Sequence, residues 1–196
     1  MELALFDFDG TITFGDTFKP FLYFAGRAPR IIAGTLLLSP MIAGYELGLV
    51  PASQMRVAAA RVAFAGRSER DILDLGRRYA TSLNRRVRPE ALARIRWHQE
   101  RGHEIVVVSA SLDVYLRAWC EQLNLPLICT QLEASAGILT GRYENGDCTG
   151  REKAKRVQSK YDLTSYSTIY AYGDTAEDTE LLGLANKRFF RWQELT

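Results

Sequence analysis

From residue 85 onward, short apolar runs rich in β-branched residues alternate with longer stretches whose apolar residues have helical spacing. The run "HEIVVVSAS" is typical of a buried parallel strand, and the stretches before and after it predict helices. Another apolar run, over residues 2–8, lies near the start of the sequence. Because strands that alternate with helices form parallel sheets covered on both faces, we expect an α/β fold with a doubly wound, Rossmann-like sheet.

Residues 16–84 separate the first predicted strand from the others, and nearly all of their apolar patterns are helical. Glycines mark several helix ends, and Ser68 is a candidate cap for the last helix of this segment. A chain of 196 residues is long enough for one α/β core together with a small inserted unit. We therefore predict a core formed by residues 1–15 and 85–196, with an all-helical insertion over residues 16–84.

Composition and charge argue against several function classes. The formal net charge is +2 and no basic run has interleaved aromatic residues, so we expect no nucleic acid partner. The three cysteines lack the spacing of a zinc site, and we expect them to be reduced in a cytoplasmic protein. The first residues do not have the pattern of a signal peptide. His98 and His103 fit no metal-binding motif, and we expect them to be surface residues of a helix and a turn.

Residues 31–50 are mostly apolar, and the stretch is about as long as a membrane span. Because Pro40, Glu46 and several glycines interrupt it, the sequence favours two buried helices that meet near Pro40. The alternative is an element that contacts a membrane surface, because cations beside an apolar hairpin suit anionic lipids. The cations nearby are Lys19, Arg27 and Arg30. Peripheral membrane association is therefore the second hypothesis for this stretch.

Polar residues gather where the predicted strands end and the next helices begin. In doubly wound sheets this edge binds the ligand, because the carboxyl ends of parallel strands lie together. The residues at these positions are Asp7, Asp9 and Thr11 after the first strand, Ser109 after the second, Lys153 at a helix start, and Asp174 and Asp178 after a later strand. Taken one at a time, each has an ordinary role as a turn residue, a helix cap or a solvated side chain. Their joint order and placement point to a functional site.

The chemistry of this set predicts a phosphate site with a metal ion. Several carboxylates in one place need a cation, and oxygen ligands favour Mg²⁺. A lysine, a hydroxyl and helix amides beside that ion form an anion site, so the expected ligand carries phosphate. One carboxylate then attacks phosphorus to give an aspartyl phosphate, and a second acid exchanges protons with the leaving oxygen and with water.

These motifs resemble those of the haloacid dehalogenase superfamily of phosphohydrolases. The matching residues are the string "DFDGT" that begins at Asp7, then Ser109, Lys153 and the string "GDTAED" that ends at Asp178. The resemblance implies that Asp7 is the nucleophile and Asp9 the general acid and base. It implies a phosphate site formed by Thr11, Ser109, Lys153, Gly10 and Ala110. It also implies a Mg²⁺ site formed by Asp7, the backbone carbonyl of Asp9, Asp174 and Asp178.

The helical insertion resembles the cap of the phosphoserine phosphatase-like branch of this superfamily. The resemblance implies that the cap residues Asp16 and Arg61 contact the substrate. The string "SASL" that begins at Ser109 stands where phosphoserine phosphatases have Ser-Gly-Gly-Phe, which argues against phosphoserine as the substrate. Small bacterial hydrolases of the same branch have an apolar cap hairpin, and some are similar to phosphatidylglycerophosphate phosphatases, which act at a membrane.

The hypothesis from the sequence is a Mg²⁺-dependent phosphomonoester hydrolase that acts through an aspartyl phosphate. Its expected substrate is a small phosphorylated metabolite or a phospholipid headgroup. A phosphotransferase of the same family is the alternative, because a sugar hydroxyl and water would meet the same Asp9. A phospho-accepting receiver module is a further alternative, but its acid pair precedes the phosphorylated aspartate and it lacks a helical insertion. The sequence leaves the physiological substrate and the oligomeric state open.

Overall fold

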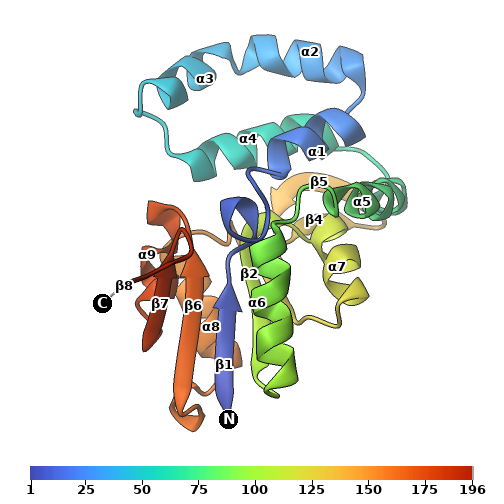
Figure 1. Ribbon diagram of the computed structural model, residues 1–196. Coiled ribbons are helices and arrows are strands. Elements are labelled where there is room, and N and C mark those ends of the chain that lie inside the picture. The colour runs from blue at the N-terminus through green and yellow to red at the C-terminus, as the bar shows by residue number, and fades with distance from the viewer. Residues whose placement is uncertain (196) are drawn as a thin grey trace.

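A six-stranded sheet forms the centre of the protein in the computed structural model, which describes residues 1–195 (Figure 1). The strand order is β3-β2-β1-β6-β7-β8, and neighbouring strands are parallel except for the antiparallel pair of β7 and β8. The strands are β1 (Glu2–Phe6), β2 (Glu104–Leu112), β3 (Leu127–Thr130), β6 (Thr168–Gly173), β7 (Lys187–Phe190) and β8 (Gln193–Leu195). The chain builds outward from β1 in both directions, which confirms the predicted doubly wound α/β fold.

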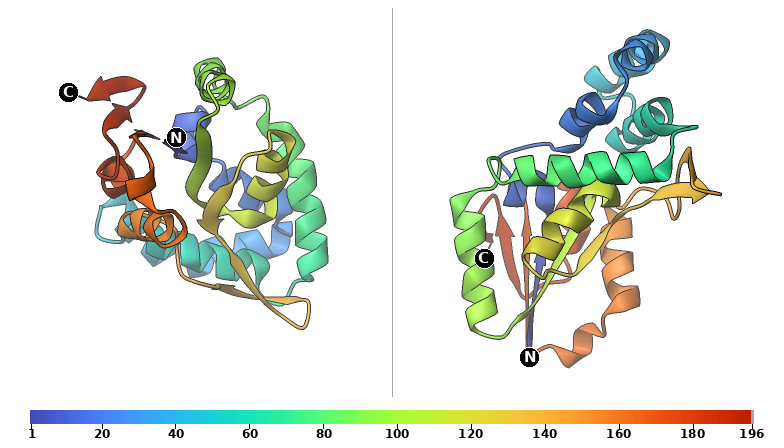
Figure 2. Two further views of the ribbon diagram at one scale, coloured as in Figure 1. Left: turned by 90° about the horizontal axis from the view of Figure 1, so that it is seen from below. Right: turned by 90° about the vertical axis from the view of Figure 1, so that its right-hand side faces the viewer.

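Helices cover both faces of this sheet, as the views from below and from the side show (Figure 2). On β1, Ala4 and Phe6 point into one apolar cluster, whereas Leu3 and Leu5 point into a second cluster on the opposite face. The helices of the first face are α6 (Pro89–Glu100) and α7 (Asp113–Gln122), and those of the second are α8 (Arg151–Lys160) and α9 (Thr179–Leu182). Burial on both faces explains why the strands read as continuous apolar runs in the sequence.

Five helices lie between β1 and α6 in the chain. They are α1 (Phe18–Ala25), α2 (Ala28–Leu37), α3 (Ser39–Glu46), α4 (Ala52–Phe64) and α5 (Glu69–Leu83). The first apolar cluster continues from the sheet into α1, α4 and α5, and a Cβ on Gly76 of α5 would overlap the backbone of α7. Helices α2 and α3 form the layer farthest from the sheet, at the top of Figure 1. The boundaries of the insertion at residues 16 and 84 stay a prediction.

The two segments that connect the sheet layer to these helices run side by side. Thr13 and Val87 form an antiparallel bridge, and the backbone N–H of Arg88 donates to the carbonyl of Ile12 over 2.9 Å. The guanidinium Nε of Arg88 donates to the carbonyl oxygens of Gly10 and Thr13 over 3.2 and 3.1 Å. The chain therefore leaves the sheet layer and returns to it at one place, where both segments are joined by hydrogen bonds.

Helices α2 and α3 differ from the prediction of two buried helices. They are helical and meet at Leu38, but Gly34 is the single buried residue of α2 and α3 has none. Leu36, Leu37 and Leu47 have exposed fractions of 71%, 75% and 73%. The prediction was wrong because these helices are apolar all round, and only their inner face packs against α4. None of the helices formed by residues 1–195 is both long enough and apolar enough to cross a membrane.

The dipeptide Asn145-Gly146 is typical of a hairpin turn, but the hairpin of this region has its turn elsewhere. It pairs β4 (Leu132–Ser135) with β5 (Ile138–Tyr143), and its turn is at Ala136 and Gly137. Both turn residues have positive φ, 49° and 76°, which suits a tight two-residue turn. The sequence prediction missed this turn because alanine seldom adopts such a conformation. The strand β8 was missed for the same reason, since its turn uses positive φ at Arg191 and Trp192.

His98 is fully buried, so the expectation that it is a surface residue was wrong. Its Nδ1 lies 2.8 Å from Nδ1 of His103, and its Nε2 lies 3.0 Å from the hydroxyl of Tyr172. A signal for this burial was present in the sequence, because Ala91, Ile95 and His98 are spaced along one face of α6. The side chain connects α6 to β6 by a polar contact within the apolar core.

We expect the contribution of His98 to the stability of the protein to fall as the pH drops below 6.5. Burial, with the nearby charges of His103, Arg94 and Arg101 adding to it, lowers the pKa of His98 from 6.5 to about 3. The unfolded chain therefore binds a proton below pH 6.5 that the folded chain does not bind until about pH 3. His98 by itself then lowers the free energy of unfolding by up to about 1.4 kcal/mol per pH unit across this window.

Urea unfolding between pH 7.5 and 5.5 measures this slope above the range in which most carboxylates titrate. His98→Gln keeps two hydrogen-bonding atoms but has no titratable ring, so as the pH drops its free energy of unfolding should fall less, or rise more, than that of the wild type. Equal slopes in the two proteins would contradict the assignment to His98.

Candidate active site

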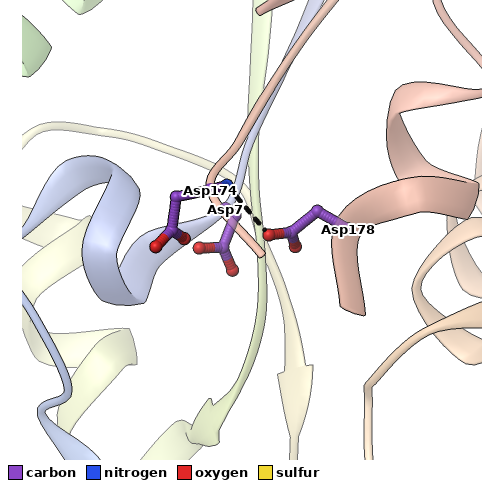
Figure 3. Close-up of side chains that lie close together, drawn as sticks. All are labelled: Asp7, Asp174 and Asp178. Atoms are coloured by element: carbon purple, nitrogen blue, oxygen red, sulfur yellow. Dashed lines mark hydrogen bonds between the residues drawn. The ribbon is translucent and has the colours of Figure 1, made fainter. Parts of the chain in front are cut away.

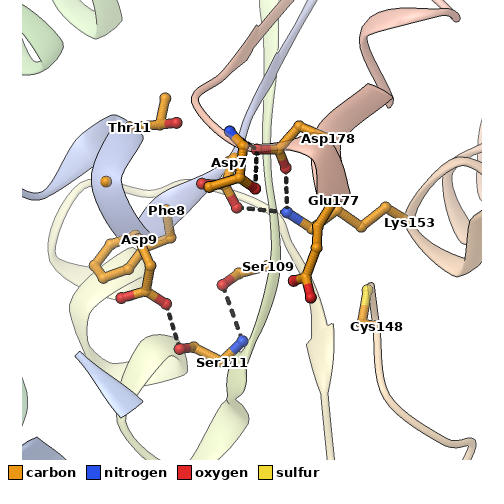
Figure 4. A network of polar contacts seen from close by, with 12 residues as sticks. Asp7, Phe8, Asp9, Thr11, Ser109, Ser111, Cys148, Lys153, Glu177 and Asp178 are labelled. Atoms are coloured by element: carbon orange, nitrogen blue, oxygen red, sulfur yellow. Dashed lines mark hydrogen bonds and ion pairs between the residues drawn. The ribbon is translucent and has the colours of Figure 1, made fainter. Parts of the chain in front are cut away.

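The polar residues singled out in the sequence come together above the carboxyl ends of the central strands (Figure 4). Asp7 directly follows β1, Ser109 lies within β2, and Asp174 directly follows β6. Asp178 ends the short helical turn η3 (Ala176–Asp178), and Lys153 lies in the first turn of α8. The strands that flank β1 are β2 and β6. The site therefore lies at the topological switch point, where the strand order reverses.

Three carboxylates form a compact cluster at this position (Figure 3). One oxygen each of Asp7, Asp174 and Asp178 lies within 4.8 Å of the other two. Asp178 is held by backbone N–H groups of Asp174 and Thr175, which both donate to its Oδ2 over 3.1 Å. Gly10 has a φ of +84°, and a Cβ there would overlap the carboxylate of Asp174. The glycine in the motif is therefore required by both its conformation and the space beside it.

Lys153 is the cation of this cluster. Its Nζ lies 2.5 Å from Oδ1 of Asp7 and 2.6 Å from Oδ1 of Asp178, and the residue is 3% exposed. Although burial acts to lower it, the two carboxylates raise the pKa of Lys153 above its usual value. The side chain therefore stays an ammonium group that joins the two acids. With one ammonium for three carboxylates, the cluster keeps an excess of negative charge.

This excess charge makes the cluster a fit for a divalent metal ion. Burial raises the pKa of Asp7 to about 8, with Lys153 acting against this and Asp178 adding to it. Burial also raises the pKa of Asp174. A cation beside these groups would favour their charged forms, and carboxylate oxygens are the ligands that Mg²⁺ prefers. The donor set therefore suits the expected Mg²⁺, with Asp7, Asp174 and Asp178 as its side-chain ligands.

Asp9 has surroundings of its own, apart from the three-carboxylate cluster. Its Oδ1 accepts hydrogen bonds from the backbone N–H of Thr17 over 2.7 Å and from the hydroxyl of Thr17 over 2.6 Å. Its Oδ2 accepts from the hydroxyl of Ser111. Burial raises the pKa of Asp9 to about 6, although the bonds from Ser111 and Thr17 act against the rise. A carboxyl group with such a pKa exchanges a proton readily near neutral pH.

Ser111 and Thr17 were not predicted as site residues, although a signal existed for one of them. Ser111 is two residues after the predicted site residue Ser109, at an irregular part of β2 where the hydroxyl of Ser109 accepts from the Ser111 N–H over 3.0 Å. Thr17 gave no such signal, because it reaches Asp9 from the segment that begins α1. These two residues fix the direction of the Asp9 carboxyl group.

The groups expected to bind phosphate lie around the cluster. The buried hydroxyl of Thr11 donates to Oδ1 of Asp174 over 3.2 Å. Gly10 belongs to the irregular turn η1 (Phe8–Ile12), and Ala110 follows the buried Ser109 in β2. These groups come from the ends of β1 and β2, so the structure brings them together with Asp7.

The expected substrate residues of the insertion have different surroundings. The carboxylate of Asp16 accepts the backbone N–H groups of Phe18 and Lys19, both over 3.0 Å, and so caps α1. Arg61 is exposed on α4, and its side chain has no hydrogen bond or ion pair within residues 1–195. The structure therefore does not bring Arg61 into the polar network around Asp7.

A different arginine of α4 reaches the sheet layer. Arg56 lies 2.8 Å from Asp147 and 3.1 Å from Glu177, measured between the nearest guanidinium nitrogen and carboxylate oxygen. Glu177 directly precedes Asp178, so this ion pair ties α4 to the segment that carries a carboxylate of the cluster. Sequence reasoning missed Arg56 because its partners are about 90 and 120 residues away in the chain.

A sequence comparison with known families agrees with the motifs. The model of the family described as haloacid dehalogenase-like hydrolase matches residues 4–183. Among curated proteins, Protein CicA of Caulobacter vibrioides is 32% identical over 195 residues, which cover 96% of this chain and 85% of the relative.

Solved structures with a similar fold extend this comparison. A Bordetella pertussis Tohama I protein of unknown function has a TM-score of 0.78 at 20% identity, covering 96% of this chain and 89% of its own. A substrate-bound phosphoserine phosphatase has a TM-score of 0.66 at 18% identity, covering 96% and 84%. At these identities the likeness shows a shared fold.

Proposed function

The chain belongs to the family of haloacid dehalogenase-like hydrolases, and from this premise we propose that it is a Mg²⁺-dependent phosphomonoesterase. The observation that carries the proposal is that Asp7 and Asp9, two residues apart, have different surroundings. Asp7 is buried against Lys153 in the carboxylate cluster, whereas Asp9 is held separately with its pKa raised to about 6. One carboxylate is thus placed as a nucleophile and the other as a proton donor.

In the first half of the proposed reaction, an oxygen of Asp7 attacks the phosphorus atom of the substrate. The bond between Asp7 and phosphorus forms as the bond between phosphorus and the leaving oxygen breaks. Asp9 gives its proton to that oxygen, so the leaving group departs as a neutral alcohol. In the second half, Asp9 takes a proton from water, the water oxygen bonds to phosphorus, and the carboxylate of Asp7 is released with inorganic phosphate.

The surrounding residues position the phosphoryl group and offset its charge. Three donors support this role: Lys153 donates to Asp7, Thr11 donates to Asp174, and the buried Ser109 lies near Asp7 (Figure 4). Mg²⁺, when bound by Asp7, Asp174 and Asp178, would neutralise carboxylate charge and polarise a phosphoryl oxygen. The proposed substrate is a small phosphorylated metabolite or a phospholipid headgroup.

We expect phosphate release from p-nitrophenyl phosphate to require Mg²⁺ and to depend on Asp174. Chelation with EDTA should abolish turnover, and added Mg²⁺ should restore it. In Asp174→Asn, loss of a charged ligand should raise the Mg²⁺ concentration for half-maximal rate by roughly tenfold or more. Asp162→Asn is the matched control, because Asp162 is exposed and caps the turn that precedes β6, whereas Asp174 follows the opposite end of this strand.

The same assay separates the proposed hydrolase from its alternatives. Release of many phosphates per chain would argue against a receiver module, which accepts one. Transfer to an added sugar in place of release would favour a phosphotransferase. Full turnover in EDTA would contradict the proposed role of the metal.

A further inference from the structure

The α2–α3 segment is apolar on both of its faces, which is unusual for helices at a protein surface. Over residues 31–50, Glu46 is the single charged residue. The outer face exposes Ile32, Leu36, Leu37 and Leu47. A helix that is apolar all round is normally buried in a large core or in contact with lipid. Because this segment is the layer farthest from the sheet, it is not buried in a core (Figure 1).

The inner face of the same segment covers a cavity of about 410 Å³. This volume lies within the range of about 300–1,000 Å³ that is usual for ligand pockets. Its apolar lining comes from α1, α2, α3 and α4 and includes Leu22, Ile31, Leu38, Ile42, Met55 and Val62. The cavity is thus a space between helices in which a hydrocarbon group would be removed from water.

Two polar residues of the cavity connect it to the candidate active site. Asp16 directly precedes Thr17, whose N–H and hydroxyl bind Asp9. Arg56 forms an ion pair with Glu177, the neighbour of Asp178. A ligand with a phosphate at Asp7 and an apolar group in the cavity would therefore be amphiphilic.

We propose that the α2–α3 segment docks on an anionic lipid bilayer and that the cavity takes the hydrocarbon part of a phosphomonoester drawn from that bilayer. This inference rests on the proposed function, and it names the substrate class as phosphorylated lipids. The docking surface is the outer face defined by Ile32, Leu36, Leu37 and Leu47.

Charge and aromatic residues around the docking surface favour an anionic bilayer as its occupant. Arg27, Arg30 and Arg67 lie together near the start of α2, where Arg30 and Arg67 also donate to the carbonyls of Ala65 and Ala25. Cations beside an inserted apolar surface attract anionic headgroups. A second copy of the chain would instead bring the same positive charges to its interface.

Exposed aromatic residues add to this argument. Tyr23 on α1 and Tyr45 on α3 are exposed where they line the cavity, and Phe24 is exposed on α1. Aromatic side chains are enriched where a protein meets the headgroup region of a bilayer. An exposed apolar face, nearby arginines and exposed aromatic residues are the residue types that a lipid-binding surface requires.

Vesicle sedimentation of the full chain tests docking. We expect binding to vesicles of phosphatidylcholine with phosphatidylglycerol, and at least tenfold weaker binding to phosphatidylcholine alone. The double variant Leu36→Asp, Leu37→Asp should lose binding, whereas Leu195→Asp, on the exposed strand β8, should keep it. All three proteins should hydrolyse p-nitrophenyl phosphate equally. Undiminished binding by the double variant, no binding by the wild type, or a dimer that this variant dissociates would each overturn docking.

A series of glycerol 3-phosphate esters with increasing acyl chain length tests the cavity. The esters are used without detergent and at concentrations at which they do not form micelles. Under these conditions kcat/KM should rise on the order of fourfold for each methylene that the cavity buries. Ala59→Phe fills part of the cavity and should remove this dependence of kcat/KM on chain length. A wild-type kcat/KM that is independent of chain length would overturn the inference, whatever the variant does.

The two experiments also separate this inference from the proposed function. If p-nitrophenyl phosphate is not hydrolysed at all, the proposed function fails, and vesicle binding still reports on docking. If it is hydrolysed and neither vesicles nor chain length matter, the lipid inference alone fails.

Discussion

Asp7→Asn should lower the rate of phosphate release by about 10⁴-fold or more, a loss of at least about 5 kcal/mol of transition-state stabilisation. The amide has the shape of the carboxylate but is a far weaker nucleophile, so no aspartyl phosphate forms. Lys153 keeps its contact with Asp178, 2.6 Å away, which preserves the fold around the site. Phosphate release from p-nitrophenyl phosphate at saturating Mg²⁺ measures the effect.

The matched control for this variant is Asp74→Asn. Asp74 is exposed on α5 and pairs with Arg77 on the same helix, so its loss should leave the rate unchanged. Labelling with a radioactive phosphomonoester gives a second readout, because the wild type should carry label on Asp7 and the variant should not. A variant with a rate near that of the wild type would eliminate Asp7 as the nucleophile.

Lys153→Met should destabilise the protein by about 3–5 kcal/mol and abolish measurable turnover. The substitution leaves Asp7 and Asp178 buried together without the ammonium that lies 2.5 and 2.6 Å from them. Unpaired buried carboxylates are strongly unfavourable, so we expect the melting temperature to fall on the order of 10 °C. Thermal unfolding without Mg²⁺ is the measurement.

Added Mg²⁺ should recover part of the lost stability, because a cation in the cluster offsets the same charges. The control is Lys155→Met, which removes an exposed lysine two residues away on α8 and should change stability little. A melting temperature equal to that of the wild type would show that the cluster does not depend on Lys153 for its charge balance.

The sequence predicted the sheet and the gathering of its polar residues because both follow from local rules. A sequence in which apolar runs alternate with helical stretches is compatible with few folds, and the doubly wound sheet is one of them. Strand ends in such a sheet meet at one edge, which is why Asp7, Asp174 and Asp178 were expected together. The structure brings their oxygens to within 4.8 Å of one another.

Features that depend on long-range packing were not predictable in this way. His98 was placed at the surface because its polarity outweighed the helical spacing that it shares with Ile95. The α2–α3 segment was expected to be buried because it is apolar, yet its partner layer covers one face only. The bond from Ser111 to Asp9 and the ion pairs of Arg56 join segments far apart in the chain. No local pattern specifies such contacts.

The bridge between Thr13 and Val87, together with the hydrogen bonds of Arg88, bears on how the sequence of the insertion can change during evolution. Both ends of the insertion are fixed side by side, and helices α2 and α3 form the layer farthest from the sheet, so a change in these two helices leaves the ends of the insertion in place. Helices at this position are then free to lengthen, shorten or change their surface over evolutionary time. Changes in helices α2 and α3 can then alter which substrate is bound, while the residues at the edge of the sheet keep their positions.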